Sequence, residues 1–189
     1  MKYLKTGLFL FIIILIAGFL RFYQLSDIPS GLNQDESALG YNAYSILTIG
    51  KDEHGQSWPL YVKSFGDYKL PAYVYLTAIS EHFFGLNEFA VRLPSALFGT
   101  LAILLLFLIV KEFTQNKRLA LVSALFLAIN PWHLFFSRAA FEDNIALTFA
   151  MLGIWLFLKA LRSKPFFYLP LSMVGFILSL YSYNVTRLL

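Results

Sequence analysis

Two pairs of adjacent carboxylates, Asp35–Glu36 and Glu142–Asp143, are the residues of this sequence best suited to acid–base chemistry. Near a membrane surface, a carboxylate can take a proton from an attacking hydroxyl group or bind a divalent cation. Each pair also has a structural alternative, because acidic residues stabilise the first turn of a helix through the helix dipole and the free backbone amides. The residue types alone leave catalysis and helix capping open for both pairs.

Three basic residues, Lys69, Arg92 and Arg138, are candidates for binding an anionic group beside these acids. A guanidinium binds a phosphate through two parallel hydrogen bonds, whereas a lysine acts as a point charge. Arg92 has the alternative of an ion pair with Glu88, one helical turn earlier. Arg138 could instead neutralise the second acidic pair, which follows it by four and five residues.

The composition indicates a membrane protein. Of its 189 residues 58% are hydrophobic, only 14% are charged and 20 are Phe, which lies outside the usual range of a soluble domain. The absence of Cys excludes disulfides, thiolate metal sites and cysteine nucleophiles, and the three His residues show no metal-ligand spacing. The net charge of +4 is scattered between apolar runs, so we expect no nucleic-acid partner.

Five stretches approach the roughly 20 apolar residues that a helix needs to cross a bilayer. They are residues 6–22, 93–110, 119–136, 145–161 and 166–183. Residues 70–85 are shorter and rich in Tyr, and counting them as a span would place the basic loop 111–118 outside, against the positive-inside rule. We therefore expect an all-α polytopic membrane protein with a cytoplasmic N-terminus and an extracytoplasmic loop over residues 23–92.

The first span could be a cleaved signal peptide, since it has a basic start and an apolar middle. It lacks an Ala-x-Ala-like cleavage site, however, and Arg21 to Tyr23 indicates a snorkelling and aromatic anchor at the membrane interface. An uncleaved span is therefore the prediction.

The long loop shows the punctuation of ordered helices. Asn33 or Asp35 can cap a helix over residues 36–47, and Gly50 is suited to end it. Residues 70–85 predict a second, interfacial helix with Pro71 in its first turn. Asp35 and Glu36 thus begin a helix near the outer membrane surface, on the same side as the second acidic pair and the three candidate cations.

The order of these segments resembles the GT-C glycosyltransferases of the dolichyl-phosphate-mannose protein mannosyltransferase and lipid A aminoarabinose-transferase group. The resemblance covers nearly the whole chain. The matching segments are Gln34–Ser37, Tyr68–Tyr73, Glu88–Gly99, Asn130–His133 and Ser137–Arg138, followed by Glu142–Asp143.

This resemblance implies a GT-C helix bundle that transfers a sugar from a polyprenyl-phosphate donor on the extracytoplasmic side, with inversion at the anomeric carbon. Asp35 matches the proposed general base, Glu36 its companion, and Glu142 or Asp143 the second essential acid. Lys69, Arg92 and Arg138 match basic positions near the donor phosphate. Some relatives bind a divalent metal near an acid ahead of the lysine, which makes Asp67 a weak metal candidate here.

The implied partners are the lipid-linked sugar, membrane lipids and a lipid, glycan or protein acceptor, and the implied location is the cell (inner) membrane. The chain stops just after a span, so we expect the amino-terminal part of one transmembrane domain in a longer protein. The alternative function is a transporter or flippase for a lipid-linked substrate, which would place acids near the middle of its spans.

Overall fold

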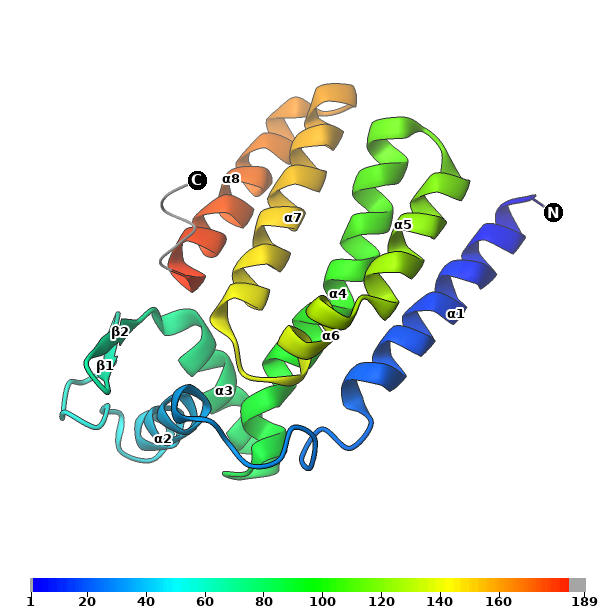
Figure 1. The fold of residues 1–189 in the computed structure, drawn as a ribbon. Helices are drawn as coiled ribbons and strands as arrows, with labels where there is room; N and C mark the ends of the chain where they lie inside the picture. Colours follow the sequence, from blue (N-terminus) through cyan, green and yellow to red (C-terminus); the bar gives the residue numbers. More distant parts are fainter. Residues whose placement is uncertain (1, 184–189) are drawn as a thin grey trace.

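The computed structural model describes residues 2–183 and is built almost entirely of helices (Figure 1). Along the chain they are α1 (Lys2–Phe22), α2 (Gln34–Ile49), α3 (Pro71–Phe84), α4 (Glu88–Thr114), α5 (Lys117–Ile129), α6 (Pro131–Arg138), α7 (Glu142–Arg162) and α8 (Pro165–Ser182). A two-stranded hairpin, β1 (Val62–Ser64) and β2 (Asp67–Lys69), lies between α2 and α3. The long helices lie side by side, and α2, α3 and the hairpin gather at one end, which we call the loop end (Figure 1).

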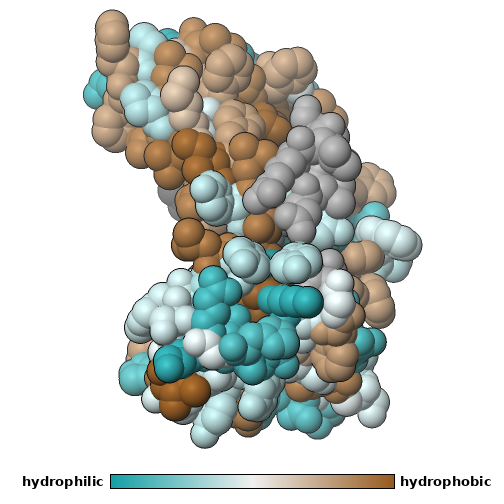
Figure 2. Space-filling view, turned by 90° about the vertical axis from the view of Figure 1, so that its left-hand side faces the viewer, coloured by the Kyte–Doolittle hydropathy of each residue, from teal (hydrophilic) through white to brown (hydrophobic). Residues whose placement is uncertain are grey.

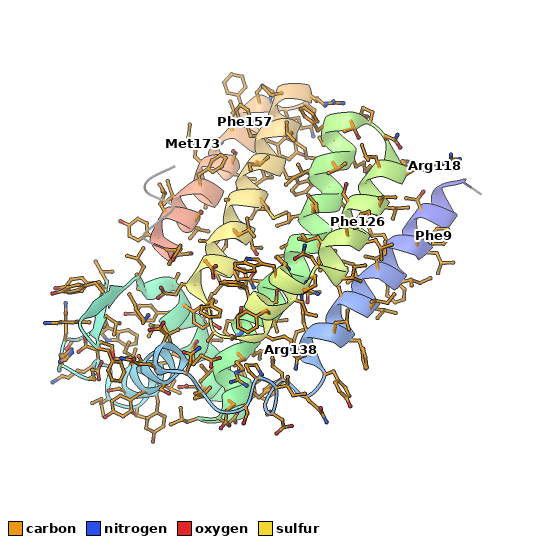
Figure 3. All side chains as sticks on the ribbon, in the orientation of Figure 1. Phe9, Arg118, Phe126, Arg138, Phe157 and Met173 are labelled. Atoms are coloured by element: carbon orange, nitrogen blue, oxygen red, sulfur yellow. The ribbon has the colours of Figure 1, made fainter. Side chains whose placement is uncertain are left out.

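Within residues 2–183, the helices α4, α7 and α8 are long and apolar enough to cross a membrane, and α5 with α6 can count as a fourth span. The segment Thr6–Phe22 of α1 is a shorter apolar helix. Labelled side chains such as Phe9, Phe126 and Met173 point away from the bundle (Figure 3). Hydrophobic residues cover the upper part of the face in Figure 2, and hydrophilic residues gather over its lower part. The polytopic, all-α fold class is confirmed.

The expected single span 119–136 is broken in two. Helices α5 and α6 meet at an angle of 57°, because Pro131 has no N–H to continue the helical ladder. Asn130 caps the new helix, accepting a hydrogen bond of 3.0 Å from the His133 amide on its side chain. The bend turns α6 away from the axis of α5 at the loop end.

Both helices predicted for the loop are present. Asn33 caps α2 in a capping box with Glu36, and Gly50 ends it with a φ of 69°. The buried face of α2, which includes Leu39 and Ala43, packs against α3. The hairpin was not predicted; its turn at Phe65 and Gly66 has positive φ at both residues, and its second strand delivers Lys69 to the start of α3.

A buried ion pair between Glu36 and Arg92 joins the loop to the spans. The two side chains are 1% and 0% exposed, and Arg92 Nε donates to Glu36 Oε1 at 2.9 Å. The same carboxylate accepts from the backbone amides of Ala140 and Asn33, each at 3.0 Å. Glu36 therefore connects α2, α4 and the turn between α6 and α7.

Helix α3 also buries an acid, Glu81, which is 3% exposed. Within the described residues, neither carboxylate oxygen of Glu81 has a hydrogen-bond partner, and the Thr77 and Ser80 hydroxyls are likewise buried and unpartnered. Helix α2 approaches closely here, since a Cβ on Gly40 would lie 3.5 Å from Glu81 Oε1. Burial raises the pKa of Glu81 from 4.5 to about 8, because the charged form loses its hydration.

Glu36→Gln should destabilise the protein by about 3–5 kcal/mol, because it leaves the Arg92 guanidinium buried without its counter-charge. Thermal unfolding of the purified protein in detergent measures this loss. The control is Glu112→Gln, which breaks the partly exposed pair between Glu112 and Arg162 at 3.5 Å and should cost less than about 1 kcal/mol. If both variants lost the same free energy of unfolding, the buried ion pair would contribute no more to stability than the partly exposed one.

The stability of the protein should fall as the pH rises from about 4.5 to about 8. Across this interval the unfolded chain ionises Glu81 while the folded protein keeps it protonated, so the unfolded state binds fewer protons. The loss should level off above the folded-state pKa. Glu81→Gln should flatten this part of a pH series of melting temperatures, and a series parallel to the wild type would contradict the assignment.

Candidate functional site

A pocket of about 250 Å³ at the loop end collects four of the residues expected to carry chemistry: Asp35, Lys69, Glu142 and Asp143. They come from α2, from the end of β2 and from the first turn of α7. The sequence separates them by up to about a hundred positions. The sequence predicts that these residues lie on the same side of the membrane, and their position in one pocket agrees with that prediction.

Asp35 and Lys69 form an ion pair inside this pocket. Lys69 Nζ lies 2.9 Å from Asp35 Oδ1, and the side chains are 8% exposed for the lysine and 56% for the acid. The buried cation has three N–H donors, so it can hold the carboxylate and a further anion at the same time. The exposed acid stays reachable from outside the pocket.

The second acidic pair begins α7, with Glu142 and Asp143 in its first turn. Asp143 Oδ1 is buried and makes no hydrogen bond within the described residues. The first turns of α2 and α7 both line the pocket, so the positive ends of two helix dipoles meet the acids there. These dipoles and Lys69 offset the repulsion that three neighbouring carboxylates would otherwise produce.

Glu36 and Arg92 lie outside the pocket lining, in the buried ion pair described above. The alternative partner of Arg92, Glu88, is not the one it has. The remaining donors of Arg92 are taken by backbone carbonyls, including those of Leu25 at 3.1 Å and Pro29 at 2.8 Å. Phosphate binding by Arg92 stays a prediction, and it would require these donors to be released.

Arg138 serves the same connecting segment rather than the second acidic pair. Its guanidinium donates to the carbonyls of Leu20 at 2.6 Å, Tyr23 at 2.7 Å and Ile28 at 2.9 Å. Figure 3 shows Arg138 at the lower end of α6, beside the chain that follows α1. Among the described residues, Arg138 makes no ion pair with Glu142 or Asp143, so it does not neutralise the second acidic pair. Phosphate binding by Arg138 stays a prediction.

Sequence reasoning missed a buried cluster around Arg21. This residue is 0% exposed rather than a snorkelling anchor, and its guanidinium lies 2.8 Å from His133 Nδ1 and donates to the Ala128 carbonyl at 3.1 Å. It thereby satisfies backbone freed by the break between α5 and α6. The signal was a cation at the end of an apolar span, which indicates a buried partner as readily as a headgroup contact.

The part of the chain that the structure describes contains no group of three or more His, Cys, Asp or Glu side chains placed to hold a metal ion. The side chain of Asp67, the weak metal candidate, is outside the described set. Binding of a divalent metal near Asp67 stays a prediction.

Comparisons with known proteins point to mannosyltransferases. The family model of dolichyl-phosphate-mannose-protein mannosyltransferases matches residues 69–189, which is more than half of the chain. A Bacillus subtilis protein named "Putative mannosyltransferase YkcB" is 25% identical over 167 residues, covering 87% of this chain and 22% of the relative. The chain thus spans about a fifth of that relative's length, and no solved structure matches it. By this family match the chain belongs to the dolichyl-phosphate-mannose-protein mannosyltransferases, which are membrane glycosyltransferases.

Proposed function

We propose that this chain carries the catalytic end of a glycosyltransferase that moves a sugar from a polyprenyl-phosphate donor to an acceptor on the extracytoplasmic side. The supporting observation is the pocket in which an exposed carboxylate, Asp35, lies 2.9 Å from a buried ammonium, Lys69. A phosphate attached to a membrane lipid needs a cation at the bilayer edge, and an acceptor hydroxyl needs a base beside it. The acceptor is a lipid, glycan or protein hydroxyl.

Asp35 acts as the general base in this proposal. It takes the proton of the acceptor hydroxyl as the oxygen bonds to the anomeric carbon, and the bond from that carbon to the phosphate oxygen breaks. Attack from the side opposite the phosphate inverts the anomeric carbon, so the ion pair between Asp35 and Lys69 opens when the acceptor oxygen and the sugar lie between the two side chains. Lys69 stabilises the charge that develops on the departing polyprenyl phosphate, which stays in the membrane.

Glu142 and Asp143 supply the second acid, and either can take that role from the first turn of α7. The buried Asp143 Oδ1 makes no hydrogen bond among the described residues, so it is suited to accept one from a hydroxyl of the bound sugar. Glu36 is a positioning residue for Asp35. Its carboxylate binds the Ala140 amide and Arg92, and these bonds hold the start of α2 beside the turn that leads into α7.

Asp35→Asn should lower sugar transfer by about a hundred- to ten-thousandfold, because the amide cannot accept the hydroxyl proton. Transfer is measured from a polyprenyl-phosphate mannose donor with the protein in membranes. Asp27→Asn is the matched control, since Asp27 is an exposed acid of the same loop and should leave the rate unchanged. Unaltered turnover in the Asp35 variant would remove this residue from the base role.

Lys69→Met should weaken the binding of polyprenyl phosphate by about ten- to a hundredfold, because the phosphate loses a charge-assisted hydrogen bond in a buried setting. Binding is followed with the purified protein in detergent, and melting temperatures confirm that the variant is folded. Lys63→Met changes an exposed lysine of the same hairpin and should bind as the wild type does. Equal affinity in the two variants would exclude Lys69 as the phosphate ligand.

A further inference from the structure

Four aromatic side chains, Trp132, Phe135, Phe136 and Phe141, form a continuous aromatic strip along α6 and the start of α7. Ring centroids are 4.8 Å apart for Phe136 and Phe141, 5.1 Å for Trp132 and Phe136, and 5.7 Å for Phe135 and Phe136. Phe136 and Phe141 line the pocket that holds Lys69. Trp132 is 75% exposed and Phe135 is 55% exposed, so the strip leads from the pocket to the outside of the molecule.

The strip is held in place from both ends. At one end Asn130 caps α6, which fixes the first turn that carries Trp132. At the other end the Glu36 carboxylate binds the Ala140 amide, one residue before Phe141. The aromatic strip is therefore positioned in part by the same ion pair that positions the pocket. Its shape does not depend on a bound ligand.

We propose that the aromatic strip binds the first isoprene units of the donor's polyprenyl chain, with the phosphate at Lys69. This inference rests on the proposed function and adds the place where the lipid leaves the pocket. An isoprene chain is apolar and unsaturated, so it gains contact with aromatic faces at each ring it passes. None of the four side chains carries a charge, and two of them share the pocket with the phosphate-binding lysine, which a chain attached to that phosphate requires.

A second apolar cavity is the rival place for the chain. It has a volume of about 510 Å³ between α2 and α3, and its lining includes Ile46, Trp58, Tyr75, Ile79 and Phe83. Trp58 and Tyr75 stack over it with centroids 6.4 Å apart. No residue lines both this cavity and the Lys69 pocket, whereas Phe136 and Phe141 of the strip do line that pocket. The strip therefore adjoins the phosphate site directly.

The experiment compares two phosphates that differ only in chain length, undecaprenyl phosphate and dimethylallyl phosphate, which has a single isoprene unit. Wild-type protein should bind the long chain more tightly. The double variant Trp132→Ala, Phe135→Ala should lower the affinity for undecaprenyl phosphate by about tenfold and leave that for dimethylallyl phosphate unchanged. The control, Phe166→Ala with Phe167→Ala, removes two exposed aromatics of α8 and should leave both affinities unchanged.

Three results would contradict the proposal that the aromatic strip binds the polyprenyl chain. An unchanged preference for the long chain in the Trp132 and Phe135 variant excludes it outright. Loss of that preference in Trp58→Ala places the chain in the second cavity. A photoreactive phenylalanine analogue at position 132 should cross-link to a diazirine-labelled polyprenyl phosphate, and a cross-link to another part of the protein would show that protein covers the strip.

Lys69→Met separates this inference from the proposed function. It should weaken the binding of both phosphates alike, because both share the phosphate group. If it weakens neither, while the Trp132 and Phe135 variant still loses its chain-length preference, the phosphate site is wrong and the strip stands. If Lys69→Met weakens both and the strip variant behaves as the wild type, the phosphate site stands and the strip is wrong.

Discussion

The buried pairing of Glu36 with Arg92 is the interaction on which the arrangement of this loop end depends. A buried carboxylate and a buried guanidinium are each costly alone, and together they persist only because hydrogen bonds satisfy their remaining lone pairs and protons. Here those bonds go to the backbone of three separate segments: the chain after α1, the cap of α2 and the turn before α7. Because Arg92 belongs to α4, this one ion pair links α4 to those three segments, beside the apolar cluster that α2, α3, α4 and α7 share.

The connection after α1 explains why arginines gather here. Residues 23–33 form no regular helix or strand, so their carbonyls need partners other than a helical ladder. Arg92 and Arg138 supply these partners from α4 and α6, with several bonds from each guanidinium. A lysine in either place would offer three donors on a flexible stem and could not bridge so many acceptors in one plane. The same planar fork that suits a phosphate also suits a cluster of carbonyls.

Local sequence patterns therefore predicted the helices of the loop, but they did not predict which side chains pair with one another across the fold. The helices over residues 36–47 and 70–85, the Asn33 cap and the Gly50 stop follow from residue types within a few positions of one another. The charge pattern of the loops placed Asp35, Lys69, Glu142 and Asp143 on one face, and one pocket holds them. Arg92 finds Glu36 across 56 positions, however, and no spacing rule in the sequence distinguishes that partner from the nearby Glu88. The break at Pro131 was missed because the apolar run continues through it, although proline there removes a backbone donor.

Adjacent residues in a helix point about 100° apart, so Asp35 and Glu36 can face different surroundings. Glu36 turns inward, completes the capping box and meets Arg92, while Asp35 turns outward and meets Lys69. The structure thus gives the capping role to Glu36 and leaves acid–base chemistry to Asp35, which stays a prediction. The first turn of α2 needs an inward acid to anchor it, and that anchor holds the outward acid opposite Glu142 and Asp143. A site built this way ties its geometry to the stability of the fold, because loosening the buried pair would shift α2, which carries Asp35, relative to the turn that leads into Glu142 and Asp143.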